Sequence, residues 1–165
     1  MIKGLHHNAY RCRDSEETRK FYEEFLGLRL AGTLEITETK SGRKTGTLHT
    51  FYELGDGSYL AFFEAPDLPF EFKPQHDFDL HIALEVDHDV LERMFARGKS
   101  SGIETRGITD HGFIRSIYFR DPSGYVIELT AKLPGHDQAM DPATNGARAK
   151  LDQWQAAKHQ KPVRT

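Results

Sequence analysis

Apolar and polar positions alternate in short runs along most of this chain, and two intervening segments carry apolar residues at helical spacing instead. Residues 3–13 read as a strand, after which Asp14 offers an N-cap with Glu17 three residues further on, as in a capping box. The helical spacing that follows stops at Gly27. Three further strands are predicted between turns rich in glycine, over residues 34–39, 45–54 and 59–64. The first part of the chain therefore predicts a βαβββ unit.

The same order of elements returns after a proline-containing connector, residues 65–77. Residues 80–87 mirror residues 7–14, and a second helical segment ends near Gly102. Strands are then predicted near residues 104–108, 113–120 and 125–130. We therefore predict an α+β fold of two tandem βαβββ modules that form a cupped mixed sheet around a metal site, with module one at 1–66 and module two at 78–132.

The composition shifts after Leu133 toward Pro, Gly, Asp, Gln, Ala and Lys, which marks residues 133–165 as a C-terminal extension. A short helix is predicted from Ala147 to His159. Its apolar side consists of Leu151 and Trp154, too little for a helix that stands alone. We expect this helical tail to dock on the body or on a second subunit.

The last two strands of module two are joined by Asp121-Pro122-Ser123-Gly124, which is turn chemistry, and the second of them carries Glu128 between apolar neighbours. A carboxylate on such a strand needs a cation, a metal or hydration, because burying an unpaired charge costs several kcal/mol. Glu128 is therefore a candidate ligand.

Overlaying the two repeats places His7 on His81 and Glu64 on Glu128. The shared spacing His-x-Ala-x-x-(Cys/Val)-x-Asp selects His7 over His6. We interpret six histidines as satisfied surface or core residues: His6, His49, His76, His88, His136 and His159. Two imidazoles with one or two carboxylates form a mixed nitrogen and oxygen set that suits Fe(II), Ni(II), Mn(II), Co(II) or Zn(II). We predict that His7, His81 and Glu128 hold such an ion, with Glu64 as a candidate fourth ligand.

Composition narrows the class of protein. The 165 residues carry a net charge of −3 with no basic patch, which argues against a nucleic-acid partner. No apolar run approaches the roughly 20 residues of a membrane span, and the first residues lack a signal-peptide core. A lone Cys12 fits a reducing compartment, where we interpret it as a packing residue. We expect a cytoplasmic protein.

With these motifs the sequence resembles the vicinal oxygen chelate superfamily. Its members include glyoxalase I, bleomycin-resistance proteins, methylmalonyl-CoA epimerase, fosfomycin-resistance thiol transferases and type I extradiol dioxygenases. The likeness spans about residues 1–132. It implies paired βαβββ modules around a cup, a divalent metal, and a small-molecule substrate that chelates the metal through neighbouring oxygens. It also implies a homodimer. Each cup would be made either within one chain or across two.

Within the superfamily, residues 109–128 are similar to the extradiol dioxygenase signature, through His111, the pair Ile117-Tyr118, the Asp-Pro-x-Gly turn and Glu128. This resemblance implies that His111 acts as an acid/base and that Tyr118 hydrogen-bonds a substrate hydroxyl. Glu64 departs from the dioxygenase pattern. The resemblance to those enzymes implies a metal held by two histidines and one carboxylate, whereas a fourth ligand is typical of glyoxalase and epimerase relatives. Three protein ligands leave an octahedral ion three positions, and four leave two.

The favoured function is therefore an Fe(II) extradiol dioxygenase that cleaves a catechol-type diol. One alternative is a glyoxalase- or epimerase-like metal-dependent isomerase or lyase, in which Glu64 and Glu128 are both ligands or one acts as the base. The second alternative is a metal-free ligand-sequestering resistance protein of the bleomycin-resistance kind. The sequence keeps all the candidate metal residues, which favours an enzyme over the sequestering protein.

Overall fold

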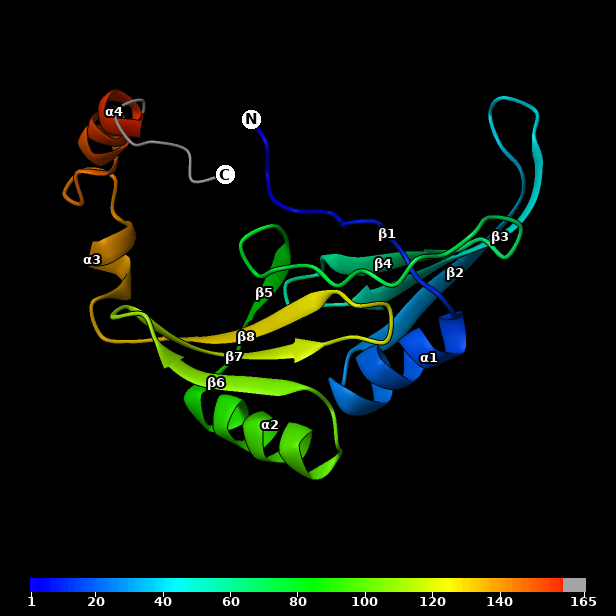
Figure 1. The fold of residues 1–165 in the computed structure, drawn as a ribbon, viewed down its shortest axis with the longest axis horizontal. Helices are drawn as coiled ribbons and strands as arrows, with labels where there is room; N and C mark the ends of the chain where they lie inside the picture. Colours follow the sequence, from blue (N-terminus) through cyan, green and yellow to red (C-terminus); the bar gives the residue numbers. More distant parts are fainter. Residues whose placement is uncertain (159–165) are drawn as a thin grey trace.

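The computed structural model describes residues 1–158. Module one begins with a short strand and a short helix that continues as one π-helical segment, followed by three antiparallel strands (Figure 1). Asp14 caps the helix, since its Oδ1 accepts a hydrogen bond from Glu17 N at 2.8 Å. The elements are β1 (Tyr10–Arg11), α1 (Ser15–Arg19), η1 (Lys20–Phe25), β2 (Arg29–Glu38), β3 (Lys44–Glu53) and β4 (Tyr59–Glu64).

Module two repeats the order of module one. Gly124, at φ 98°, supplies the left-handed residue of its last turn, and an added Cβ there would lie 2.5 Å from the Lys73 carbonyl oxygen. The elements are β5 (His81–Glu85), α2 (His88–Ser100), β6 (Thr105–Asp110), β7 (Ile114–Arg120) and β8 (Val126–Lys132).

Each module forms a four-stranded mixed sheet with the same topology. The strand orders are β1-β4-β3-β2 and β5-β8-β7-β6, and in each sheet the first and last strands of the module pair in parallel. This arrangement confirms the α+β fold with tandem βαβββ modules.

One hydrophobic core lies between the helices and the sheets and joins the two modules. Phe25 of η1 packs edge-on against Phe119 of β7, with ring centroids 5.1 Å apart. The Tyr22 hydroxyl, also from η1, donates a 2.9 Å hydrogen bond to Asp121 in the β7–β8 turn. Figure 1 shows α1 and α2 on the same side of the molecule, below the sheets. Neither α1 nor α2 covers the opposite face of the sheets, which we call the cup face.

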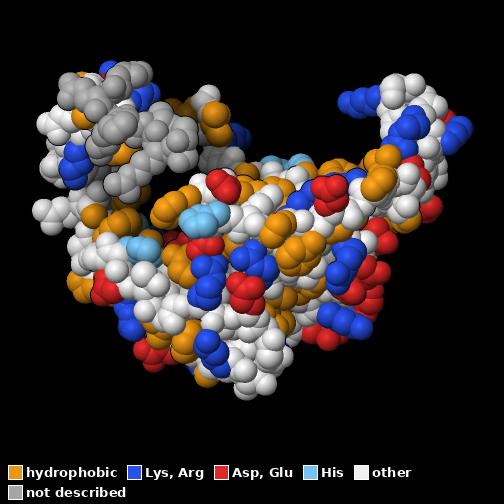
Figure 2. All heavy atoms as spheres, in the orientation of Figure 1, with side chains coloured by type: hydrophobic (Ala, Val, Ile, Leu, Met, Phe, Trp, Pro, Cys, Tyr) orange, Lys and Arg blue, Asp and Glu red, His pale blue; other side chains and the backbone are white. Residues whose placement is uncertain are grey.

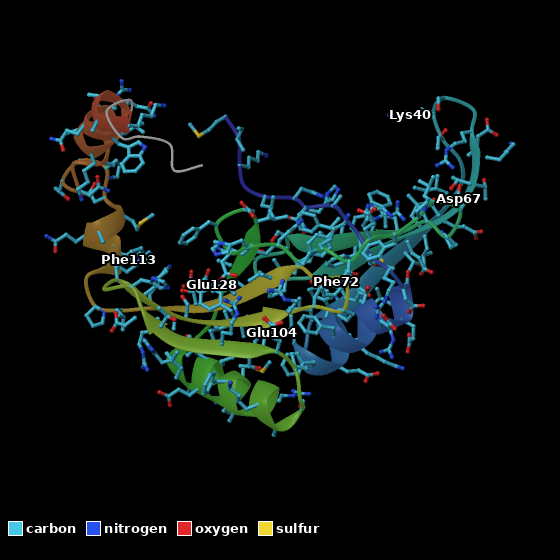
Figure 3. All side chains as sticks on the ribbon, in the orientation of Figure 1. Lys40, Asp67, Phe72, Glu104, Phe113 and Glu128 are labelled. Carbon is cyan, nitrogen blue, oxygen red and sulfur yellow. The ribbon has the colours of Figure 1, made fainter. Side chains whose placement is uncertain are left out.

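Several predicted elements differ in extent from the observed ones. The first strand was expected over residues 3–13, but β1 covers Tyr10–Arg11, and His7 forms only an isolated parallel bridge with Tyr59. In contrast, β2 begins earlier than predicted, at Arg29, and with β3 forms a long hairpin whose tip carries lysine and arginine side chains (Figure 2). Asp67 of the connector reaches this hairpin and pairs with Arg43 (Figure 3).

The C-terminal extension contains α3 (His136–Met140) and α4 (Ala147–Lys158), which confirms the short helical tail; His159, the predicted end of that helix, lies outside the described residues. Leu151 and Trp154 are about half exposed, at 51% and 58%. No described helix is both long enough and apolar enough to cross a membrane. Docking of the tail on a second subunit stays a prediction.

Candidate metal centre

His81 and Glu128 lie together on the cup face of module two. His81 Nε2 is 3.1 Å from Glu128 Oε2, and the Glu128 side chain is only 6% exposed whereas that of His81 is 38% exposed. The strand register explains the contact, because Ala83 pairs with Glu128 and His81, two residues earlier, points to the same side. Glu128 can be followed from β8 in Figure 3.

Both ring nitrogens of His81 face hydrogen-bond acceptors. Nδ1 is 2.6 Å from the backbone oxygen of Asp77, and Nε2 faces the Glu128 carboxylate. A neutral imidazole carries one N–H, so it cannot satisfy both acceptors. A second proton or a cation between Nε2 and Glu128 would do so, and a histidine that donates Nδ1–H to a carbonyl while presenting Nε2 is the usual arrangement of a metal ligand. The donor pair therefore fits a divalent ion.

Tyr118 lies beside this pair, on the neighbouring strand and on the same face. It is the register partner of Glu128, and its hydroxyl is 3.0 Å from His111 Nε2. Burial raises the pKa of Tyr118, and the Glu128 carboxylate raises it further, so the phenol keeps its proton at neutral pH. The structure thus brings four of the sequence-derived candidates together through successive contacts: His111, Tyr118, Glu128 and His81.

His7 lies on the cup face of module one, among aromatic rings. Its ring centroid is 5.6 Å from that of Phe51 and 6.1 Å from that of His49. His49 is buried and stacks on Phe63 at 3.7 Å. His7 Nδ1 is 2.8 Å from His6 Nδ1, which leaves Nε2 of His7 available. The structure does not bring His7 to His81 and Glu128 within one chain, since the residues described contain no group of three or more potential ligands able to hold an ion.

Glu64 lies on the other face of its sheet, which corrects the overlay of Glu64 on Glu128. His7 is bridged to Tyr59 as His81 is paired with Val126, so the counterpart of Glu128, two residues on, is Ala61. Glu64 is three residues beyond Ala61, so its side chain points to the helix face. There Glu64 Oε2 accepts a 2.8 Å hydrogen bond from Ser15 N at the start of α1. The carboxylate caps a helix in place of facing the cup.

Two residues beside this centre were missed by sequence reasoning. Asp77 lies in the connector and presents its backbone oxygen to His81, and Arg106 of β6 binds both oxygens of the Asp77 carboxylate, at 2.8 and 2.9 Å. No motif signals this pair. The hairpin over residues 104–120 could have suggested Arg106, because it stands directly across from Tyr118.

Comparison with known proteins agrees with this geometry. Residues 4–129 match the model of the Glyoxalase/Bleomycin resistance protein/Dioxygenase superfamily. The chain belongs to this superfamily. The match covers both modules and both cup faces, and stops before the C-terminal extension. The superfamily combines metal-dependent enzymes with resistance proteins, which is the coarse functional class of this chain.

Individual superfamily relatives are distant. The metallothiol transferase FosB of Shouchella clausii (strain KSM-K16) is 24% identical over 139 residues, 78% of this chain and 80% of FosB. The fosfomycin resistance protein FosX from Listeria monocytogenes, solved with Mn(II) and a sulfate ion, superposes with a TM-score of 0.61 at 20% identity, covering 84% of this chain and 99% of FosX. A glyoxalase/dioxygenase from Nostoc punctiforme gives a TM-score of 0.61 at 25% identity, over 79% and 92% of the two chains.

Proposed function

We propose that this superfamily member is a metal-dependent extradiol dioxygenase that cleaves a catechol-type aromatic diol next to its hydroxyls. The observation that carries the proposal is the 3.0 Å contact between His111 and Tyr118 directly beside Glu128. This contact supports the proposal because an acid/base and a phenol donor beside Glu128 would be near the oxygens of a diol held by the metal. The same two residues complete the dioxygenase signature in the sequence.

The metal centre would consist of His81 and Glu128 of one chain and His7 of a second copy. This assignment follows from the separation of His7 from the other two ligands, together with the exposed edges of β1 and β5, each of which pairs with one strand only. A homodimer that sets module one of one copy against module two of the other would close the cup. The ion, with Fe(II) favoured, would supply a Lewis acid that binds adjacent substrate oxygens.

The position of Glu64 supports three ligands over four. Two histidines and one carboxylate leave open positions on one side of an octahedral ion, the arrangement typical of non-haem Fe(II) oxygenases. The isomerase alternative in which Glu64 is a ligand loses its fourth donor, because Glu64 is held on the helix face by Ser15 N. The proposal therefore needs no displacement of a carboxylate when the diol binds.

The chain's own residues would perform two tasks. Tyr118, whose pKa is raised, would donate a hydrogen bond to one substrate oxygen, and His111, in contact with the Tyr118 hydroxyl, would accept or return a proton at the neighbouring hydroxyl. The aromatic cup face of module one, with His49, Phe51 and Phe63, would pack against the substrate ring and exclude water. An aromatic wall opposite a polar, metal-binding wall suits a diol on an aromatic ring.

A second candidate function is fosfomycin resistance by thiol transfer, which the likeness to FosB favours. A phosphonate would call for free cations in the cup. The register places Arg106, Arg120 and Lys132 on the cup face of module two, and each is paired, with Asp77, Glu104 and Glu85 respectively. These described cations are already neutralised, so we rank this function second.

The deciding experiment loads the full-length protein anaerobically with Fe(II), adds a panel of catechols and dihydroxybiphenyls, and follows oxygen uptake and the coloured ring-opened product. We expect turnover that is lost in His111→Ala and kept in Glu64→Ala. Absence of oxygen uptake across the panel, together with Mn(II)-dependent consumption of fosfomycin and a thiol, would replace the dioxygenase by the second candidate. Tight binding of an aromatic antibiotic by a protein that retains no metal would indicate the sequestering alternative.

A further inference from the structure

We propose that Arg106 and Asp77 form a clamp that fixes the His81 ring for metal binding, which makes Arg106 a positioning residue of the centre. The inference rests on the proposed metal centre of His81 and Glu128. Asp77 lies in the connector between the modules, four residues before His81, and its backbone carbonyl oxygen is 2.6 Å from His81 Nδ1. That hydrogen bond determines which nitrogen of His81 faces Glu128.

The Asp77 carboxylate is held from the sheet. Arg106 Nη1 and Nη2 donate to its two oxygens at 2.9 and 2.8 Å, a bidentate pair with fixed geometry. The pair is partly buried, with 43% of the Arg106 side chain and 24% of the Asp77 side chain exposed. The hydrogen bonds from Arg106 also lower the pKa of Asp77 below its ordinary value of 3.8, so the carboxylate is charged at neutral pH. An arginine on β6 thus sets the position of a connector residue.

Arg106 is connected to the proposed proton donor as well. It is the register partner of Tyr118, and its guanidinium carbon lies 5.4 Å from the centre of the Tyr118 ring. The clamp therefore contacts both sides of the centre: His81 through the Asp77 backbone, and Tyr118 through the ring face.

The rest of the connector is anchored by hydrogen bonds that Arg106 does not make. Lys73 N donates to Ser123 O at 2.8 Å, and Arg120 Nη1 donates to Gln75 O at 3.4 Å. These contacts fix the path of the connector up to residue 75, where it lines a hollow of about 350 Å³. Losing Arg106 should therefore free Asp77 and the His81 ring without detaching the connector.

The test compares Arg106→Gln and Asp77→Asn with the matched control Arg93→Gln, which breaks an ion pair between Arg93 and Asp89 on the exposed surface of α2. The first readout is the NMR signal of the His81 Hδ1 proton, assigned with His81→Asn, in protein without added metal. We expect a protected signal in the wild type and the control, and its loss through rapid solvent exchange in both clamp variants. Arg106→Lys keeps the positive charge but donates from a single nitrogen, so it should restore part of the protection.

The second readout is Co(II) affinity in competition with a chromophoric chelator. Mutation of a residue that hydrogen-bonds to a metal-binding histidine typically lowers metal affinity by about 10–100-fold. We therefore expect the Co(II) affinity of each clamp variant to be lower than that of the wild type by about tenfold or more. The double variant should be no weaker than either single one, because the two residues act as a unit. Circular dichroism checks that each variant is folded. If Arg106→Gln unfolds the protein, the nearly isosteric Asp77→Asn still tests the clamp.

The outcomes separate the clamp from the proposed function. Clamp variants that keep the protected Hδ1 signal and bind Co(II) within twofold of the wild type would overturn the clamp. A wild-type protein that binds Co(II) but takes up no oxygen with any catechol would overturn the dioxygenase and leave the clamp supported. A wild type with a protected Hδ1 and no Co(II) binding would overturn the proposed centre, while loss of that signal in the clamp variants would still support the positioning of the ring.

Discussion

His81 Nε2 lies 3.1 Å from Glu128 Oε2 although the two residues are not register partners, since His81 pairs with Val126 and Glu128 follows two residues later. This offset puts both side chains on one face of two neighbouring parallel strands. The same offset in module one leads from His7 to Ala61. The tandem repeat therefore builds two cup faces with different chemistry, and only one of them carries a carboxylate at this position.

Glu64→Gln is expected to leave metal content unchanged, whereas Glu128→Gln is expected to remove it. The reason is that Glu64 accepts from Ser15 N on the helix face and Glu128 faces His81. Metal analysis of chelator-free protein measures both. A Glu64→Gln protein without metal would show that Glu64 is a ligand and would favour the isomerase alternative.

Glu64→Ala should instead lower stability. It removes the acceptor of Ser15 N at the first turn of α1, a loss that in helix capping typically costs about 1 kcal/mol. Urea unfolding of the metal-free protein measures the change, with Glu53→Ala, another partly exposed strand carboxylate, as the control. A Glu64→Ala protein as stable as the wild type would show that the cap contributes nothing.

His111→Phe and Tyr118→Phe are expected to lower kcat for ring cleavage by about 10²–10⁴-fold, because each removes a proton donor or acceptor from the reacting oxygens. Metal content should stay near that of the wild type. Stopped-flow measurement of product colour under single turnover separates the chemical step from binding. Equal kcat in His111→Phe and the wild type would show that His111 takes no part in the chemical step.

Tyr22→Phe is expected to destabilise the protein by about 2 kcal/mol at pH 7, because the buried Asp121 carboxylate loses a hydrogen-bond donor. Burial raises the pKa of Asp121 above its ordinary 3.8. As the pH falls, Asp121 in the folded protein therefore takes up a proton before the unfolded chain does, and the neutral form needs the donor less. The cost of Tyr22→Phe should shrink between pH 7 and pH 4, as measured by urea unfolding. A cost that grows toward acid pH would contradict this sign.

Much of this structure follows from local signals in the sequence. The Asp-Pro-Ser-Gly turn predicted the hairpin that carries Glu128, and the structure has β7 and β8 paired antiparallel around it. Strand β4 was predicted with its observed bounds, and the cap at Asp14 was correct. These features depend on residues close together in the chain.

The errors arose where register between distant strands decides the outcome. Glu128 lies two residues beyond Val126, the partner of His81, whereas Glu64 lies five residues beyond Tyr59, the partner of His7. The difference is an odd number of residues, which reverses the face of the sheet. The contact between Asp77 and Arg106 joins residues far apart in the chain, and no local pattern marks it. Within the described residues His7 does not meet the other two ligands, although the sequence predicted that the three converge.

The most direct test of the account is complementation between His7→Ala and His81→Ala. Each variant alone should bind no metal and cleave no catechol. If a cup takes His7 from one copy and His81 with Glu128 from the other, unfolding the two together and refolding them in equal amounts gives mixed dimers with one intact cup. Random pairing by twofold symmetry then restores about one quarter of the wild-type metal content and oxygen uptake. Mixtures that stay without metal and activity, while each variant still folds and dimerises, would contradict a centre shared between two copies.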